Sequence, residues 1–201
     1  LAKNRKEDFL NADIVFINPA VPRTSPFIKL CVDNKIPLDT ELNLFFKLCP
    51  ATIIGITGSN GKTTSTTLSY LMLNDFITNY NNAFGKNFKV WLGGNIGISL
   101  LEEVNNISKD DIVLLEMSSF QLEDLSCLSK SPSISAVTNI SPNHLDRHVT
   151  MENYITAKKN IINFHDENSF AVLNLEDEEI SKWGKSYNGN VFFFSSKREV
   201  P

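Results

Sequence analysis

Runs of apolar residues alternate with amphipathic stretches along most of the chain. The centres of runs such as ATIIGIT and DIVLLEM are continuously apolar, which is typical of strands buried on both faces of a sheet. The predicted strands are 12–17, 51–57, 90–94, 111–117, 134–140, 170–175 and 190–195. The predicted helices are 25–34, 62–73, 98–104, 150–164 and 176–187. Strands that alternate with helices predict an α/β fold with a mostly parallel sheet flanked by helices.

Loop signals interrupt this pattern at two places. The Asn-rich stretch NYNNAFGKN (79–87) predicts an exposed loop. The segment around Pro50 predicts a domain boundary, because ELNLFFKL precedes it and the buried ATIIGIT strand follows it. We therefore expect residues 1–49 and 50–201 to belong to different domains.

Three of the predicted strands run directly into clusters of polar residues. The clusters are GSNGKTT (58–64), EMSSFQ (116–121) and NISPNHLDRH (139–148). Ligands of open parallel sheets bind at the carboxyl ends of the strands. The three clusters are therefore expected to form one ligand site.

Residues 58–64 have the composition of a phosphate-binding loop. Gly58 and Gly61 permit close approach of backbone N–H groups to an anion, and the helix predicted from Lys62 has free N–H donors at its N-terminus. Lys62 would neutralise phosphate oxygens, and Thr63 would offer its hydroxyl to Mg²⁺. The candidate ATP-binding residues are Gly58, Ser59, Asn60, Gly61, Lys62, Thr63 and Thr64.

This loop is a shorter variant of the general phosphate-loop pattern. A strict G-x-x-x-x-G-K-[ST] needs Gly at position 56, where this chain has Ile56. The alternative is an Asn60-Gly61 hairpin turn, although Lys-Thr-Thr and an amphipathic stretch follow it instead of a second strand. The variant TGSNGKT resembles the loop of the Mur ligase family and of its folylpolyglutamate synthetase relatives.

The resemblance extends along nearly the whole chain. LGGNIG, LLEMSSFQLEDL, VTNISPNHLDRH and YITAKKNII resemble successive motifs of the D-glutamate-adding members of the family. SSFQLE is the motif that best separates the D-glutamate-adding members from other ligases of the family, which share the phosphate loop but differ at this position. The resemblance implies a P-loop-type central domain over 50–201. NPAVP and IPLDTELNLF resemble the end of the Rossmann-like, UDP-binding N-terminal domain that precedes it, so we expect the chain to be a fragment.

Acidic, histidine and lysine candidates lie in the later motifs. A carboxylate at the position of Glu116, at a strand end, could hold Mg²⁺ opposite the phosphate loop or form an ordinary salt bridge. The resemblance implies that Glu116 and His144 are metal-site residues. It also implies that Lys158 is carbamylated by CO₂ and becomes a ligand of a second Mg²⁺. The alternatives are that Lys158 is a solvated helix residue, or that Lys159 is the matching lysine. The candidate metal ligands are Thr63, Glu116, His144 and Lys158.

Short polar side chains near the strand ends are candidates for substrate contacts. The resemblance implies that Asn95, Ser118, Gln121 and His144 face the substrate. Turn formation and capping of a short helix by a serine remain the alternative for this group. Phe120, between the polar residues, is expected to belong to the core.

Taken together, the resemblance implies an ATP-dependent amide ligase of peptidoglycan synthesis. It would add D-glutamate to UDP-N-acetylmuramoyl-L-alanine through an acyl phosphate, with Lys62, Glu116, His144 and Lys158 as catalytic residues. One alternative is another ligase of the family or a folylpolyglutamate synthetase, against which SSFQLE argues. The other is a non-catalytic P-loop nucleotide-binding module, which would have no use for a second metal site.

Composition narrows the choice of partners and environment. The formal net charge of −4 disfavours non-specific binding of nucleic acid. No apolar stretch approaches the roughly 18 residues needed to cross a bilayer. The three scattered cysteines, Cys31, Cys49 and Cys127, predict reduced thiols and a cytoplasmic location. We expect a monomer.

Overall fold

The computed structural model describes residues 5–96, 99–185, 187, 189–197 and 199–200. The helices are α1 (Lys6–Leu10), α2 (Pro26–Asp33), α3 (Glu41–Leu48), α4 (Lys62–Phe84), α5 (Ser119–Leu125), α6 (Leu145–His148), α7 (Met151–Asn163) and α8 (Glu178–Lys185). Short 3-10 turns are η1 (Val104–Asn106) and η2 (Ser126–Leu128). The strands are β1 (Val15–Phe16), β2 (Leu38–Asp39), β3 (Thr52–Thr57), β4 (Val90–Gly94), β5 (Ile112–Glu116), β6 (Ile134–Val137), β7 (Phe170–Asn174) and β8 (Asn190–Phe194).

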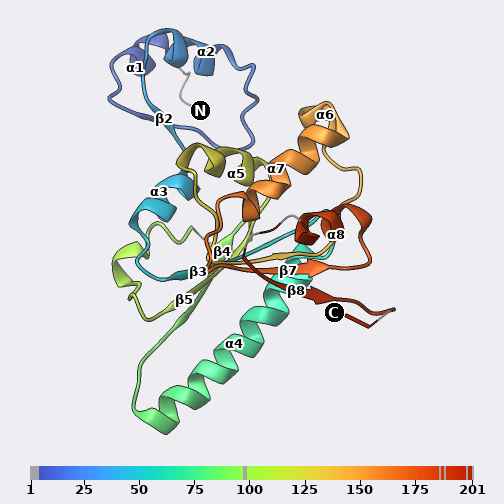
Figure 1. Cartoon of the computed structure of the whole chain (residues 1–201). Coiled ribbons are helices and arrows are strands. Elements are labelled where there is room, and N and C mark those ends of the chain that lie inside the picture. Colours follow the sequence, from blue (N-terminus) through green and yellow to red (C-terminus); the bar gives the residue numbers. More distant parts are fainter. Residues whose placement is uncertain (1–4, 97–98, 186, 188, 198, 201) are drawn as a thin grey trace.

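The main sheet has six strands in the order β4-β5-β3-β6-β7-β8, and every pair is parallel. Helices cover both of its faces (Figure 1). The predicted α/β class with a parallel sheet flanked by helices is therefore confirmed.

Strand β3 lies between β5 and β6 and brings three carboxyl ends together. Ile56 is paired with Glu116 of β5, and Thr57 is paired with Val137 of β6. Strands β4 and β5 lie on one side of β3, and the later strands β6, β7 and β8 lie on its other side. This reversal of strand order is a switch point of the sheet, where ligands of such folds bind. The segments that follow β3, β5 and β6 are the three polar clusters of the sequence.

One face of the sheet carries α5, α7 and α8, and α4 covers part of the other (Figure 1). The core lies on the first face, where apolar side chains of strands and helices are removed from water. Its fully buried members include Val113, Leu115, Leu122, Leu125, Val137, Ile161, Leu173, Ile180 and Trp183. This packing fixes α5 and α7, which carry several of the candidate site residues.

Helix α4 is longer than predicted, so the loop predicted for 79–87 is wrong over 79–84, while 85–87 lie beyond the helix and most of the stretch is exposed as expected. The helix continues to Phe84 and ends at Gly85, a left-handed C-cap residue. Tyr80 contacts the ring of Phe84, with centroids 4.7 Å apart, and Asn81 exchanges two hydrogen bonds with the backbone of Phe88. These contacts stabilise helical structure in an Asn-rich stretch whose composition alone indicates a loop.

The distal half of α4 projects beyond the sheet (Figure 1). Apolar side chains from the middle of α4 to its end remain in contact with water, among them Leu71, Met72, Phe76 and Phe84, each more than half exposed. Although α4 has 23 residues, no helix within the described ranges is both long and apolar enough to cross a membrane.

The helix predicted for 98–104 is also wrong over its described part, and Ile98 lies outside the described residues. Residues 100–103 form turns that lead into η1. The Ser99 hydroxyl accepts a hydrogen bond from the Leu101 amide, which competes with a helical ladder. Leu100 and Ile107 are both buried, so the segment turns tightly to place both against the core. Gly97 of LGGNIG and Ser186 at the end of the predicted helix 176–187 also lie outside the described residues.

Residues before Pro50 form a separate two-stranded parallel sheet, in which β1 pairs with β2. Helix α3 was not predicted from the sequence. It begins after Thr40, whose hydroxyl accepts a hydrogen bond from the Asn43 amide. The division at 49/50 and the Rossmann-like character of the first part stay predictions. The three cysteines are free, as expected.

Candidate active site

The loop between β3 and α4 leads into the N-terminus of a helix. A Cβ on Gly58 would lie 1.9 Å from the Thr138 hydroxyl oxygen, so only glycine fits where this loop passes β6. Gly61 is the N-cap of α4, and the helix begins at Lys62. The free N–H groups at this N-terminus attract anions. The hairpin-turn alternative is therefore wrong, because a helix follows the loop.

The segment after β6 holds this loop in place. The amides of Ser59 and Asn60 donate to the backbone and side-chain oxygens of Asn139 at 2.8 and 2.9 Å. The Asn60 carbonyl accepts from Thr138 Oγ1 at 2.8 Å and from Asn139 Nδ2 at 2.9 Å. The Ser59 hydroxyl lies 2.9 Å from the hydroxyl of Tyr154 on α7. Sequence reasoning missed the supporting roles of Thr138, Asn139 and Tyr154, which only the pairing of β3 with β6 reveals.

Glu116 connects the phosphate loop with the segment after β4. Its side chain is buried, and its two carboxylate oxygens accept from Thr63 Oγ1 at 2.7 Å and from Asn95 Nδ2 at 3.0 Å. Gly94 has φ +91°, and a Cβ there would lie 2.2 Å from the Glu116 carbonyl oxygen. Glycine is required for this approach. Within the described part of the chain no ion pair involves Glu116, so its predicted salt-bridge alternative gains no support.

Lys158 on α7 is one of the most deeply buried side chains, with 1% of its surface exposed. Its ammonium group donates to Thr57 Oγ1 at 3.1 Å and to the Gly58 carbonyl at 2.9 Å. Burial, and secondarily the charge of Lys62, lower the pKa of Lys158 to about 7, while Glu116 opposes the shift. The solvated-lysine alternative is wrong, and Lys158 rather than the partly exposed Lys159 reaches the loop.

The oxygen atoms around Glu116 fit a hard cation. Thr63 and Glu116 offer a hydroxyl and a carboxylate, which Mg²⁺ prefers together with phosphate oxygens and water. The described residues contain no group of three or more His, Cys, Asp and Glu that could hold a metal by themselves. A cation here would therefore depend on phosphate oxygens as further ligands.

His144 lies apart from this cluster in the contacts of the described residues. It is exposed, adopts a left-handed conformation with φ +52°, and precedes α6 as its N-cap. Its ring centroid is 5.0 Å from that of Phe120. No contact joins His144 to Glu116 or Lys158 in the described structure, so its metal and substrate roles stay predictions.

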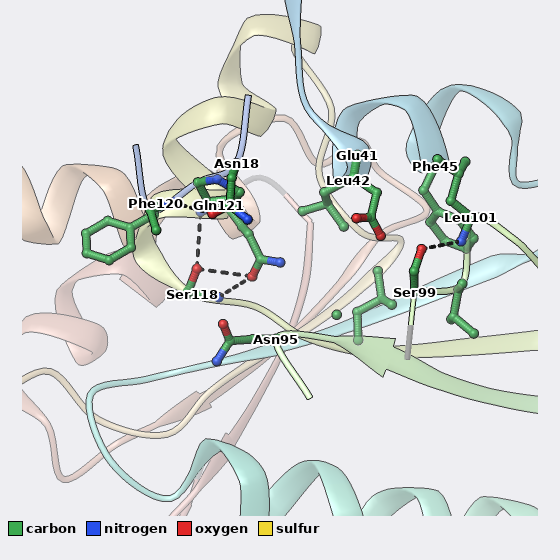
Figure 2. A pocket seen from close by; sticks show the side chains of 15 residues that line it. Asn18, Glu41, Leu42, Phe45, Asn95, Ser99, Leu101, Ser118, Phe120 and Gln121 are labelled. Atoms are coloured by element: carbon green, nitrogen blue, oxygen red, sulfur yellow. Dashed lines mark hydrogen bonds between the residues drawn. The ribbon is translucent and has the colours of Figure 1, made fainter. Parts of the chain in front are cut away.

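A cavity of about 430 Å³ adjoins the cluster and contains three of the four predicted substrate residues, Asn95, Ser118 and Gln121 (Figure 2). The remaining lining residues are Asn18, Pro19, Ala20, Glu41, Leu42, Phe45, Gly94, Ser99, Leu100, Leu101, Leu115 and Phe120. The cavity thus has walls from both sides of Pro50. Asn18 and Glu41 were not predicted as lining residues, although they lie in NPAVP and IPLDTELNLF, which resemble part of a UDP-binding domain.

Phe120 is only half-buried, and the expectation that it belongs to the core is wrong. It lines the cavity, and its ring stacks on His148 with centroids 5.2 Å apart. The guanidinium of Arg147 lies over the same ring, 4.0 Å from its centroid. Contacts from α6 therefore hold this side chain at the cavity.

Ser118 and Gln121 form a capping box at the start of α5. Gln121 Oε1 accepts from the Ser118 amide at 2.9 Å, and the Gln121 amide donates to the Ser118 hydroxyl oxygen at 3.2 Å. The capping alternative is therefore realised in residues that also line the cavity. Because Oε1 is used by the cap, the side-chain NH₂ of Gln121, on the side away from Ser118, remains for a ligand (Figure 2).

Comparison with sequence families identifies a match to the Mur ligase middle domain over residues 56–200. A UDP-N-acetylmuramoylalanine–D-glutamate ligase of Acetivibrio thermocellus is 42% identical over 185 residues, which cover 92% of this chain and 37% of that protein. A ligase of the same name from Clostridium kluyveri is 38% identical over 200 residues, covering 100% and 41%. The chain thus spans about two fifths of the length of these curated relatives.

Two solved structures resemble the fold. The MurF ligase of Thermotoga maritima in complex with ADP matches with a TM-score of 0.58 and 20% identity, over 95% of this chain and 52% of that one. The UDP-N-acetylmuramate:L-alanyl-gamma-D-glutamyl-meso-diaminopimelate ligase of Neisseria meningitides matches with a TM-score of 0.60 and 16% identity, over 93% and 60%. At these identities the likeness supports the fold alone.

Replacing Lys158 with Met should flatten the dependence of stability on pH. The pKa of Lys158 falls from an ordinary 10.5 to about 7 on folding, so the unfolded chain binds more protons between these values. The free energy of unfolding of the unmodified chain therefore rises as pH increases through this window. Urea unfolding at pH 7 and pH 9, in buffers purged of carbon dioxide, measures the rise. Lys159→Met is the matched control and should keep it; an undiminished rise in Lys158→Met contradicts the assignment.

Proposed function

The chain belongs to the Mur ligase family, and on this basis we propose that it is the ATP-binding part of a ligase that adds D-glutamate to UDP-N-acetylmuramoyl-L-alanine. Curated relatives that are 36–42% identical carry this activity in their names. The reaction forms an amide bond of the peptidoglycan precursor at the expense of ATP. Its substrates are cytoplasmic metabolites, so the cytoplasm is the proposed location.

The observation that carries the proposal is the meeting of the phosphate loop with Glu116 beside a cavity. Thr63 of the loop and Asn95 of the cavity wall bind the two oxygens of one buried carboxylate. A nucleotide on the loop and an acceptor in the cavity would therefore be adjacent. A non-catalytic nucleotide module would leave both the cavity and the buried Lys158 without a role.

The proposed reaction begins with attack of the alanyl carboxylate on the γ-phosphorus of ATP, which gives an acyl phosphate and ADP. The amine of D-glutamate then attacks the acyl carbon, and phosphate leaves. Two anions approach each other in the first step, so positive charge is needed where phosphate oxygens lie. The position of Lys62 supports this role, because its ammonium group donates a hydrogen bond to the Ser59 carbonyl of the loop at 3.1 Å.

The cation Mg²⁺, held by Thr63 and Glu116, would neutralise charge on the phosphate oxygens. Family resemblance extends this site to carbamylated Lys158 and to His144. For Lys158, attack of its neutral amine on CO₂ forms an N–C bond and releases a proton, which leaves an anionic oxygen donor. The proposal is supported by the burial of Lys158 and by its position against the loop carbonyl of Gly58, within reach of the phosphate site.

Replacing Lys62 with Ala should lower the rate of ATP-dependent ligation in the complete enzyme by about 10²–10³-fold, because one charge-stabilising contact of the transition state is lost. Phosphate release and formation of the D-glutamyl product measure it. Lys182→Ala, an exposed lysine on α8, is the control and should retain full activity. A rate close to that of the unmodified enzyme in Lys62→Ala would refute the role.

Replacing Gln121 with Glu should separate substrate binding from helix capping. Glutamate is equally suited to the capping box, so the free energy of unfolding should change by no more than about 0.5 kcal/mol. The cavity, however, exchanges an NH₂ donor for an anion, and affinity for the anionic UDP-linked substrate should fall at least about tenfold. Isothermal titration and thermal unfolding measure the two effects. Unchanged affinity would show that Gln121 only caps α5.

A further inference from the structure

We propose that Arg23 is a positioning residue, whose ion pair with the buried carboxylate of Asp124 holds residues 18–25 against α5 and so completes one wall of the substrate cavity. Neither residue lines the cavity itself. The inference depends on the proposed function only for the identity of the ligand.

Asp124 links α5 to two other elements that line the cavity, the segment 18–25 and helix α3. It lies on α5, one helical turn after Gln121, and its side chain pairs with Arg23. Its carbonyl oxygen accepts from Asn43 Nδ2 on α3 at 3.1 Å. Residues 18–20, helix α3 and the start of α5 all contribute lining residues. One residue of α5 thus fixes both elements that come from before Pro50.

The burial of the pair is asymmetric. The Asp124 side chain is 4% exposed, whereas that of Arg23 is 42% exposed. A buried carboxylate is costly without a cation or several donors, and loss of its partner leaves an uncompensated charge. Among the described residues, Arg23 is the cation that pairs with Asp124. Removal of Arg23 therefore favours any rearrangement that admits water to this carboxylate, including separation of residues 18–25 from α5.

The segment 18–25 has few other polar attachments. The amides of Ala20 and Val21 bond to Asn18 within the same turn, at 2.8 and 2.9 Å. In the described structure, the Arg23–Asp124 pair is the polar contact that joins this segment to the chain beyond Pro50. The wall formed by Asn18, Pro19 and Ala20 consequently depends on it.

The phosphate loop does not depend on the same contact. It is held by Asn139 and Tyr154, which belong to the chain after Pro50. Loss of Arg23 should therefore weaken binding in the cavity and leave nucleotide binding intact. This separation distinguishes positioning from a general loss of stability.

The first test needs no ligand. Amide hydrogen exchange of the 201-residue chain is compared in Arg23→Gln, Arg23→Lys, the double variant Arg23→Gln/Asp124→Asn, and Arg5→Gln. Arg5 pairs with Asp8 on the surface, where both side chains are more than half exposed, so Arg5→Gln is a matched control of low expected effect.

Exchange at Ala20, Val21 and Gln121 should accelerate at least about tenfold in Arg23→Gln. It should return toward the original rate in Arg23→Lys, which keeps the charge, and in the double variant, which removes the buried charge. Arg5→Gln should match the unmodified chain. Unchanged exchange in Arg23→Gln, or an equal increase across β3 and α7, would overturn the proposal.

The second test measures binding of UDP-N-acetylmuramoyl-L-alanine and of ATP separately, by nuclear magnetic resonance titration. Arg23→Gln should weaken the first at least about tenfold and change the second by no more than about twofold. Equal weakening of both ligands, or no change in either, would overturn the positioning role. If the unmodified chain binds neither ligand, the proposed function fails, and the exchange experiment alone decides whether Arg23 positions the wall.

Discussion

The parallel pairing of β3 with β5 on one side and β6 on the other is the constraint on which the site depends. It places the ends of three strands side by side, so that side chains more than fifty residues apart in sequence become neighbours. Thr63 and Glu116 meet for this reason, and Asn139 reaches the phosphate loop for the same reason. Asn95 joins them because β4 pairs with the other side of β5. Strand order, rather than any single motif, assembles the chemistry.

The site keeps its buried charges apart from one another. Glu116 is satisfied by a hydroxyl and an amide, and Lys158 by a hydroxyl and a carbonyl, so neither is consumed in an ion pair in the described structure. Neutral partners hold the side chains in place, so the Glu116 carboxylate remains available to a cation and the Lys158 nitrogen to the proposed carbamylation. The Arg23–Asp124 pair shows the opposite arrangement, since its charges satisfy each other and serve to hold elements together.

The sequence predicted the parallel sheet and the phosphate loop because both depend on local signals. Apolar runs mark buried strands, and glycines before Lys-Thr-Thr mark an anion site at a helix start. Family resemblance added Lys158, which the pattern of apolar and polar residues alone does not distinguish from Lys159. The length of α4 was not predicted because its Asn-rich end has the composition of a loop. Ring contacts of Tyr80 and two hydrogen bonds between Asn81 and the backbone of Phe88 stabilise the helix there. Arg23 and Asn139 were missed because their roles arise from contacts between distant segments.

Helix α4 exposes several apolar side chains to solvent. Met72, Phe76 and Phe84 present apolar surface on a stretch whose neighbouring side chains are mostly uncharged, so the formal net charge of −4 gives little repulsion there. Phe192 and Phe194 are likewise exposed on β8, the last strand of the sheet. Apolar surface of this kind favours contact with other apolar surfaces, and charged substitutions on α4 would reduce it.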